Sequence, residues 1–416
     1  MEIPSFRDSQ PEIAAMMRSQ GGLGVLLFDF HHLGRVERQF GGGAYHGLWA
    51  QVQPILDEVK AQVRTNDLLV RDERDTDLFL LFLASRRHGK PTFVASDIRK
   101  LCDRLEEFIT PRVARLMLPY FRDRPRVDVG YGFVLHTPLE GEDRQILRLV
   151  EEARKSTLMR RSVRERDDRE SLLQIIYNQD LWTAFQPIIE MDSGSVMGFE
   201  ALARGPRGTE LEYPAALFGL ASRFGLGDEL ERAARRQSFT DWQAFGAPAR
   251  LFINTVPATV RDTSFLGRGV LDYLGPTLSP RFVTLEITEG QVIANINLYR
   301  EAMHSFTELG FSFAIDDLGA GYSGLETLAT LGASYLKIDM GLVRDVHQKR
   351  VSQQVVKAIL DMGTGVGAIV IAEGIETAEE AEALQGLGVR YAQGYFFGRP
   401  QDPYASTPQQ TVRSAS

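Results

Sequence analysis

Short apolar runs that end in polar residues recur through the second half of the chain. Eight such runs can be read: TAFQPIIE, VMGFEALAR, RLFINTVP, FVTLEITE, FSFAIDDLG, SYLKIDM, GAIVIAEGI and YAQGYFFGRP. Segments whose apolar residues follow a helical period separate most of them. This alternation predicts a (β/α)8 barrel of the TIM type, an α/β fold whose functional residues gather at the carboxyl ends of the strands.

The connection between the first two runs is too short for a parallel crossover. Only MDSGS separates them, whereas a crossover needs about a dozen residues or more. We therefore expect an antiparallel first strand. Such a strand begins at the catalytic face, so Gln186 should lie at the same rim as Glu200.

Two of the helical segments, VSQQVVKAILDMG and TAEEAEALQGLG, end in glycine. Glycine favours the left-handed conformation that commonly ends a helix. The pattern predicts helix ends at Gly363 and Gly388.

Polar side chains close the apolar runs, and many of them are carboxylates. They are Glu200, Asn254, Glu286, Asp316, Asp317, Lys337, Glu373 and Gln393. Converging carboxylates repel one another unless cations compensate their charge. Oxygen ligands without histidine favour hard ions such as Mg²⁺ or Mn²⁺. The four negative charges of Glu200, Glu286, Asp316 and Asp317 match two divalent ions, and Asn254 offers a further oxygen ligand. Two such ions can clamp both oxygens of a phosphodiester hydrolysis.

The loop after Asp317 also allows a second interpretation. Gly319, Gly321 and Gly324 spell the G-x-G-x-x-G pattern of a dinucleotide-binding turn, and Asp339 mimics its ribose-binding acid. Two carboxylates directly before the glycines would oppose a pyrophosphate. The metal-binding strand end is therefore the preferred prediction.

Composition places the chain among ordinary globular proteins. It has 416 residues, 44% hydrophobic and 25% charged, with a formal net charge of −8. The sequence contains no basic stripe of the kind that would predict a DNA or RNA polymer as a partner. The single cysteine, Cys102, excludes an intrachain disulfide, and no apolar run approaches the roughly 20 residues of a membrane span. We expect a cytoplasmic protein without membrane insertion.

The motifs GFEALARGP, FINTVP, LEITE, IDDLGAGYSGL, LKID, IAEGIE and QGYFFGRP follow one another over about residues 180–400. In this order they resemble the EAL domains, the cyclic di-GMP phosphodiesterases. The resemblance implies two Mg²⁺ or Mn²⁺ ions as cofactors and hydrolysis of cyclic di-GMP to linear pGpG. It also implies a homodimer through this domain.

The resemblance assigns roles residue by residue. Glu200, Asn254, Glu286, Asp316 and Asp317 would be metal ligands, with Asp316 bridging; Lys337 would orient the nucleophilic water, and Glu373 would coordinate metal or assist proton transfer. Gln186, Leu202 and Arg204 would line the substrate, Arg204 on a phosphate, and Gln393 would join the water and metal network. Glu289 would anchor the loop after Asp317, and Glu376 would support the AEGIE turn. Leu318 stands where the family usually has phenylalanine, and GASY replaces a common Pro-x-Asp, but no ligand is lost.

The N-terminal half predicts an α+β domain that resembles the GGDEF, or diguanylate cyclase, domain. Its first strand ends at Asp29, but the signature hairpin reads RDTDLF, with Asp75 and Thr76 in place of glycines, and Glu37 replaces the substrate-contacting asparagine. We predict a degenerate GGDEF-like regulatory domain without cyclase chemistry. Arg64 to Asp67 match the low-information RxxD pattern, which binds cyclic di-GMP in some cyclases, although a polar helix end is the simpler explanation. Gly41 to Gly43 predict a turn.

These patterns give four segments: a GGDEF-like domain over 1–160, a connecting helix over 161–179, the EAL barrel over 180–402 and a flexible tail over 403–416. Besides the enzyme, two alternatives stay open. One is a cyclic di-GMP receptor that acts through a protein partner, and the other is a scaffold that binds no nucleotide. A receptor typically lacks metal ligands, and a scaffold would lack Arg204 or the EAL strand. This chain keeps the proposed metal ligands, Arg204 and the EAL strand.

Overall fold

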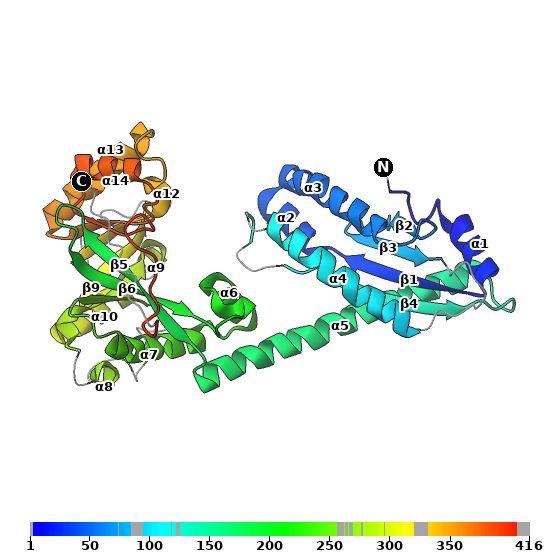
Figure 1. The fold of residues 1–416 in the computed structure, drawn as a ribbon, viewed down its shortest axis with the longest axis horizontal. Helices are drawn as coiled ribbons and strands as arrows, with labels where there is room; N and C mark the ends of the chain where they lie inside the picture. The colour runs from blue at the N-terminus through cyan, green and yellow to red at the C-terminus, as the bar shows by residue number, and fades with distance from the viewer. Residues whose placement is uncertain are drawn as a thin grey trace. The chain divides into compact units, whose positions relative to one another are not determined.

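The structure is a computed structural model that describes residues 3–73, 75–84, 95–117, 119–121, 125–255, 262, 265, 269–275, 278–294, 296–319 and 332–405. The chain divides into two compact units, residues 1–171 and 172–416 (Figure 1). Among the described residues, no helix is long and apolar enough to cross a membrane.

The first unit is built on a four-stranded sheet in the order β2-β3-β1-β4, with every neighbouring pair antiparallel. Its elements are α1 (Gln10–Gln20), β1 (Gly22–Asp29), α2 (His31–Phe40), α3 (Gly42–Ala61), β2 (Leu68–Arg71), β3 (Leu78–Leu83), α4 (Ala95–Met117), β4 (Asp128–Leu135) and α5 (Glu142–Asn178). The second half of α5 contains most of the segment predicted as a connecting helix, and the helix ends in the second unit.

The helices of the first unit form two layers, and alternate side chains of β1 contact one layer or the other. Leu26 and Phe28 pack with α2, α3 and α4 on one face of the sheet, whereas Val25 and Leu27 pack with α1 and α5 on the other. Successive side chains of a strand point to opposite faces, so one apolar strand serves both cores. The predicted α+β domain is confirmed.

Glycines in β4 allow α5 to approach the sheet closely. A Cβ atom added at Gly130 would lie 2.1 Å from Thr157 Oγ1, and one added at Gly132 would lie 2.7 Å from the Leu149 carbonyl oxygen. Only glycine fits at such distances. The two glycines of the VGYGF stretch therefore allow α5 to pack closely against β4.

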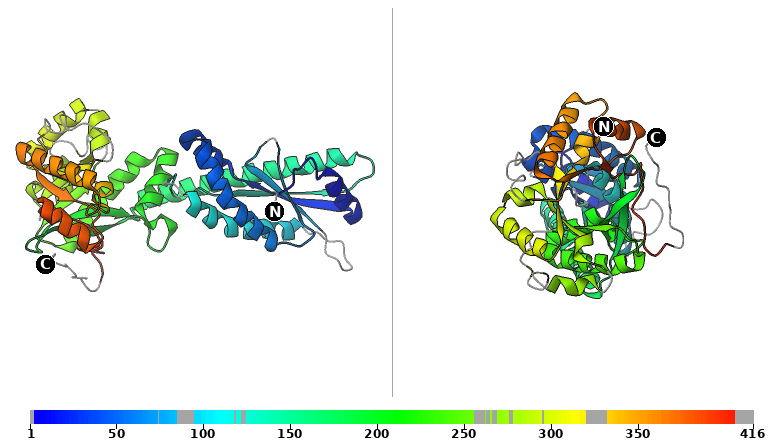
Figure 2. Two further views of the ribbon diagram at one scale, coloured as in Figure 1. Left: turned by 90° about the horizontal axis from the view of Figure 1, so that it is seen from above. Right: turned by 90° about the vertical axis from the view of Figure 1, so that its left-hand side faces the viewer.

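The second unit is a closed barrel in the strand order β10-β11-β12-β5-β6-β7-β8-β9 (Figure 2). Its strands are β5 (Trp182–Glu190), β6 (Val196–Arg204), β7 (Arg250–Asn254), β8 (Val283–Thr288), β9 (Ser312–Leu318), β10 (Tyr335–Ile338), β11 (Ile369–Ala372) and β12 (Tyr391–Ala392). Its helices are η1 (Glu210–Glu212), α6 (Pro214–Phe224), α7 (Gly227–Phe245), α8 (Gly269–Leu274), η3 (Pro280–Phe282), α9 (Glu289–Ala294), α10 (Ile296–Glu308), α12 (Met340–Val343), α13 (Arg350–Val366) and α14 (Ala378–Leu387).

The first barrel strand runs against its neighbours, as the short connection predicted. β5 pairs antiparallel with both β6 and β12, and the register places Gln186 directly opposite Glu200. The remaining neighbours pair in parallel. The predicted barrel with one antiparallel strand is thus confirmed.

One predicted helix end is wrong. α14 ends before Gly388, which has a φ of 102°, but Gly363 lies inside α13, and the left-handed cap is Gly367 with a φ of 74°. A Cβ atom at Gly363 would lie 2.7 Å from Val370 Cγ2. Gly363 therefore serves close packing between α13 and β11 rather than the end of the helix.

The last described residues are held against the barrel. The Tyr404 hydroxyl donates to the Asp241 carboxylate at 2.6 Å, and Asp402 forms an ion pair with Arg207 at 2.5 Å. Residues 406–416 of the predicted tail lie outside the described residues.

Candidate active site

The carboxyl ends of the parallel strands bring the predicted polar residues to one rim of the barrel. Register pairs Asn254 at the end of β7 with Glu286 in β8, and Thr288 at the end of β8 with Asp316 in β9. Lys337 lies in β10, and Glu373 and Gln393 directly follow β11 and β12. Parallel strands of a barrel end on the same face, which explains why residues so distant in sequence converge.

Lys337 is the centre of this arrangement. Its side chain is fully buried, and its Nζ lies 2.5 Å from Glu373 Oε1 and 2.7 Å from Glu286 Oε1. Asp316 Oδ1 and Glu200 Oε2 lie at 3.4 and 3.5 Å. One ammonium group therefore faces four carboxylates.

Burial shapes the ionisation of these groups. Burial raises the pKa of Glu286 and of Glu373 well above the usual range, and the charge of Lys337 offsets this only in part. Burial alone would lower the pKa of Lys337, but the four surrounding carboxylates outweigh it and raise that pKa well above its usual value. Without a further cation, burial among like charges therefore favours the protonated forms of Glu286 and Glu373.

The donor atoms fit hard divalent cations. Among the described residues, Glu286 Oε2 is buried and accepts no hydrogen bond, whereas Glu286 Oε1 and Glu373 Oε1 face the Lys337 ammonium. Buried acceptors without partners are costly, and a cation would satisfy them. The described side chains contain no group of three or more acids, histidines or cysteines that is arranged to hold a metal ion, and the Lys337 ammonium lies among the carboxylates.

A chain of amides connects Glu200 to the neighbouring strands. Gln393 Nε2 donates to Glu200 Oε2 at 2.6 Å and to Gln186 Oε1 at 3.2 Å. Asn254 Nδ2 donates to the other Glu200 oxygen at 3.2 Å, and Gln186 Nε2 donates to the Gly398 carbonyl. These bonds fix the orientation of the Glu200 carboxylate.

The end of β9 carries an unusual backbone conformation. Asp317 has a φ of 59°, in the left-handed region that residues other than glycine and Asn or Asp seldom adopt. Its side chain is exposed, whereas Leu318 is fully buried. The buried Glu289 accepts a hydrogen bond from the Gly319 amide at 3.4 Å, so it lies at the start of the loop after Asp317. Residues 320–331 of that loop lie outside the described residues.

The dinucleotide-binding interpretation finds no support in the described part of the loop. The Asp339 carboxylate accepts the Gly341 amide at 2.8 Å and caps α12, so it is a helix cap. Gly321 and Gly324 lie outside the described residues.

Arg204 lies at the end of β6 with Leu202, opposite the beginning of β5. Its guanidinium donates to the carbonyls of Leu202 and Ala203 at 3.3 and 2.9 Å, and among the described residues it has no ion pair. Burial lowers its pKa. A partly buried guanidinium without a carboxylate is suited to an anionic ligand.

Sequence reasoning did not identify Glu380, which accepts the backbone amide of Glu376 at the end of the AEGIE turn. Glu376 forms a bidentate ion pair with Arg344 at 2.7 and 2.9 Å, and both side chains are 41% exposed. The nearly buried Glu380 accepts the amides of Glu376 and Asp345 at 2.9 and 3.0 Å. Thr377 and Glu380 form a capping box, and its T-x-x-E spacing was readable from the sequence.

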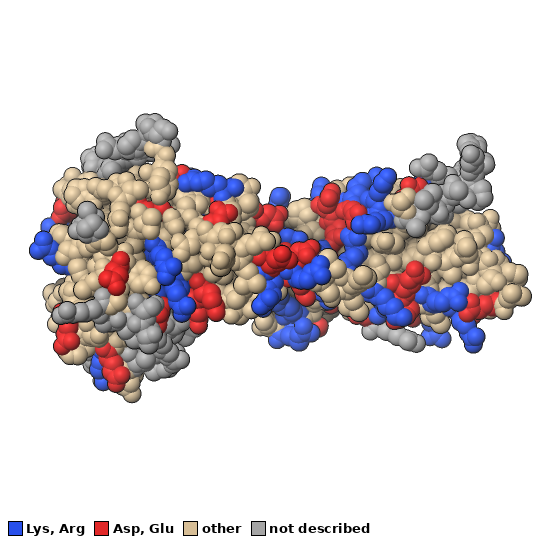
Figure 3. All heavy atoms as spheres, turned by 90° about the horizontal axis from the view of Figure 1, so that it is seen from below, with Lys and Arg blue, Asp and Glu red and all other residues tan. Residues whose placement is uncertain are grey.

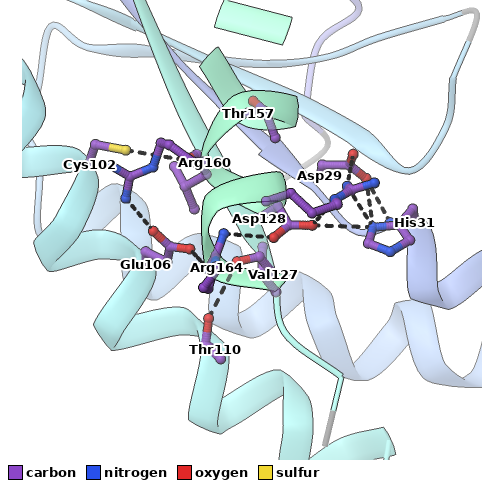
Figure 4. A network of polar contacts seen from close by, with 12 residues as sticks. Asp29, His31, Cys102, Glu106, Thr110, Val127, Asp128, Thr157, Arg160 and Arg164 are labelled. Carbon is purple, nitrogen blue, oxygen red and sulfur yellow. Dashed lines mark hydrogen bonds and ion pairs between the residues drawn. The ribbon is translucent and has the colours of Figure 1, made fainter. Parts of the chain in front are cut away.

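In the first unit, Asp29 ends β1 directly opposite Asp128 of β4. Arg161 donates to both, at 2.7 and 2.6 Å. Arg164 adds a bond to Asp128 at 2.8 Å (Figure 4). Burial would raise the pKa of Asp29, but His31 and Arg161 outweigh it and lower that pKa. Two arginines of α5 therefore supply the cations for this pair of acids.

The remaining motifs of the first unit have structural contacts. The buried Asp67 accepts the amides of Arg64 and Ala84 at 2.9 and 2.6 Å, which fastens RTND to the end of β3. Gly41 separates α2 from α3 with a φ of 86°, as a turn requires, while the next glycines begin α3. Glu37 lies in α2, and Asp75 and Thr76 lie between β2 and β3.

Comparisons with known proteins show which family matches the second unit. The model of the EAL domain family matches residues 169–400. An uncharacterized protein of Synechocystis sp. is 28% identical over 95% of this chain and 57% of its own length. The cyclic di-GMP phosphodiesterase NbdA of Pseudomonas aeruginosa is 30% identical over 58% of this chain and 32% of its own length.

A solved structure supports the fold. The Xanthomonas citri FimX EAL domain in complex with c-diGMP aligns with a TM-score of 0.53 and 19% identity, over 59% of this chain and 97% of that chain. The chain spans between about a third and somewhat more than half of the curated relatives named above.

Proposed function

The chain belongs to the EAL domain family, and from this premise we propose that it hydrolyses cyclic di-GMP to linear pGpG. The observation that carries the proposal is a buried cluster of four carboxylates around Lys337, formed by Glu200, Glu286, Asp316 and Glu373. It lies at the rim of the barrel where TIM-barrel enzymes have their active sites. The name of the relative NbdA supports the same reaction.

The proposed cofactors are two Mg²⁺ or Mn²⁺ ions. Glu200, Asn254, Glu286, Asp316, Asp317 and Glu373 would hold them, with Asp316 shared. Such ions supply Lewis acidity that stabilises the charge developing on the phosphodiester. The proposed ligands are all oxygen donors, and the buried Glu286 Oε2 has no hydrogen-bond donor among the described residues; both facts support this choice of ion.

In this proposal Lys337 and Glu373 handle the attacking water. The Lys337 ammonium orients the water oxygen toward phosphorus, and Glu373, 2.5 Å from that ammonium, accepts the proton. Glu373 Oε1 is the carboxylate oxygen nearest to that ammonium, which positions it to accept a proton from a water held there. The bond from phosphorus to the ribose oxygen breaks, and that oxygen takes up a proton, so water is added across one ester.

The proposed substrate-binding residues surround the acid cluster. Arg204 would exchange its bonds to backbone carbonyls for a substrate phosphate. Gln186 and Leu202 would line the ligand, and Gln393 would keep Glu200 oriented. Glu289 and Glu376 would support loops through Gly319 and Arg344.

For the N-terminal half we propose a degenerate GGDEF-like regulatory domain over 1–160 that makes no cyclic di-GMP. Arg161 is paired with Asp29, the acid that ends the first strand, which opposes the binding of a divalent ion there. Residues 161–179 would connect it to the catalytic barrel at 180–402. The barrel would dimerise, and the N-terminal domain would receive a protein partner.

We further propose a cytoplasmic location, because the substrate is an intracellular messenger and the one cysteine is unpaired and buried. A polymer of DNA or RNA is not a proposed partner, and the face in Figure 3 shows Lys and Arg among Asp and Glu rather than in one basic surface.

The deciding experiment is pGpG formation by the purified chain with Mg²⁺ or Mn²⁺, followed by chromatography. The proposal expects turnover that stops when the metal is chelated and resumes when it is restored. Tight binding of cyclic di-GMP without any pGpG under either metal would replace the enzyme with a receptor.

A further inference from the structure

The residues that follow the last barrel strand pass along the edge of β5. β12 is two residues long and pairs with Ile189 and Glu190, at the end of β5. Earlier along the same edge, Gln401 forms an isolated antiparallel bridge with Phe185, in which each backbone amide donates to the other carbonyl, at 2.8 and 2.9 Å. We call residues 401–405 the C-terminal strap. The strap takes the place beside the beginning of β5 that a longer β12 would occupy.

A second contact of the strap reaches this edge through a buried carboxylate. The Tyr404 hydroxyl donates to Asp241 Oδ1 at 2.6 Å, and the backbone amide of Thr183 donates to Asp241 Oδ2 at 2.7 Å. The hydrogen bond to the fully buried Asp241 raises the pKa of Tyr404 to about 12, so the hydroxyl keeps its proton and remains a donor. The edge amides of residues 183 and 185 therefore bond to Asp241 and to the strap.

A third contact holds the loop that follows β6. Asp402 Oδ2 pairs with Arg207 at 2.5 Å, while Asp402 Oδ1 accepts the backbone amide of Tyr404 at 2.9 Å. The Arg207 guanidinium lies over the ring of Trp182, with its carbon 4.0 Å from the ring centroid. Because Trp182 is the first residue of β5, Asp402 fixes this loop against the beginning of that strand.

Trp182 lies in the same row of side chains as the proposed substrate-binding residues. The register of β5 and β6 pairs Trp182 with Arg204, Ala184 with Leu202, and Gln186 with Glu200. Residues directly opposite each other in an antiparallel pair point to the same face, and so do alternate residues of one strand. The side chain of Arg204 therefore stands beside the ring that Arg207 covers.

We propose that the C-terminal strap positions the substrate-binding rim of the barrel, with Asp402 and Tyr404 as its positioning residues. Asp402 acts on Arg204 through the loop after β6 and the Trp182 ring. Tyr404 acts through Asp241 on the beginning of β5. The inference rests on the proposed binding of cyclic di-GMP at this rim.

The topology predicts which kinetic constant depends on the strap. Glu286, Asp316 and Lys337 lie in β8, β9 and β10, strands that do not pair with β5. A loosened rim at β5 and β6 should therefore raise Kd and KM and leave kcat nearly unchanged, the pattern of lost uniform binding. An ion pair as exposed as that of Asp402 and Arg207 adds little to global stability, so its loss should hardly move the urea midpoint.

The test uses the full chain with Asp402→Ala and Tyr404→Phe combined. Cyclic di-GMP titrated in Ca²⁺ should bind about tenfold more weakly, and KM in Mg²⁺ should rise about as much, while kcat stays within about threefold. The single variant Asp402→Glu keeps the carboxylate and should bind within about threefold of wild type. The matched control is Arg390→Gln, which breaks an ion pair with Glu190 at the opposite end of β5 and should bind as wild type.

Amide exchange followed by mass spectrometry adds a measurement that needs no nucleotide. Exchange over residues 182–190 should become faster in the double variant, while residues 283–288 of β8 exchange as in wild type. Affinity equal to that of Arg390→Gln, a lower kcat at unchanged KM, or unchanged exchange over 182–190 would each overturn the proposal. Wild type that binds cyclic di-GMP without cleaving it would refute the proposed hydrolysis but not this inference, which is read from affinity and exchange.

Discussion

Replacing Lys337 by methionine tests the centre of the candidate active site. Methionine is unbranched, apolar and of similar length, so packing around the side chain is largely kept. The ammonium that faces Glu200, Glu286, Asp316 and Glu373 within 3.5 Å is lost. The substitution therefore removes charge from a fully buried position without opening a large cavity.

The structure sets the size of the effect. Removing one partner of a buried ion pair costs about 3–5 kcal/mol. Glu286 and Glu373 already have raised pKa values, so they can take up protons instead of remaining charged. We therefore expect the free energy of unfolding to fall by about 3 kcal/mol without metal, at the low end of this range. Divalent ions would supply part of the missing charge and should reduce that loss. Turnover should fall by about 10²-fold or more, because the attacking water loses the group that orients it.

Three measurements on one preparation separate these effects. Urea unfolding with chelator and with Mg²⁺ gives the stability loss, and chromatography of pGpG gives turnover. Binding of cyclic di-GMP in Ca²⁺ should remain close to wild type, because Lys337 orients water rather than substrate. Lys357→Met, on the exposed side of α13, is the matched control. Turnover of Lys337→Met within about threefold of wild type would refute the assigned role.

Three further predictions address other parts of the chain. Arg204→Ala should weaken cyclic di-GMP binding about tenfold or more, as loss of a charged phosphate contact would, while turnover at saturation changes less; equal binding in a titration would contradict it. Arg161→Ala should destabilise the first unit by about 3 kcal/mol because Asp29 loses its arginine and Asp128 keeps only Arg164, whereas the surface pair tested by Arg148→Ala should cost less than about 1 kcal/mol; equal losses in urea would contradict the network. Burial, with the charges of neighbouring His31, lowers the pKa of His32 to about 3 from 6.5, so protons bind the unfolded chain first and stability falls as pH drops below 6.5. Wild type should lose about 2 kcal/mol more than His32→Gln between pH 6.5 and 5, and parallel pH profiles would refute this.

Local patterns in the sequence were enough to predict the barrel and its antiparallel strand. A five-residue connection cannot cross over a sheet, so MDSGS required a hairpin, and the hairpin put Gln186 opposite Glu200. Strand ends likewise predicted Glu286, Asp316 and Lys337 at one rim, since parallel strands share a direction. These conclusions depend on chain geometry over a few residues, which a sequence displays directly.

The partners of each charged group depended on the tertiary structure. Nothing near Glu376 in sequence shows that Arg344 pairs with it, or that Arg161 reaches Asp29 from α5. Gly363 looked like a helix end because the same residue serves a cap and a close contact, and only the position of β11 distinguishes the two. Such contacts join side chains far apart in sequence, and their distances are set by packing rather than by spacing along the chain.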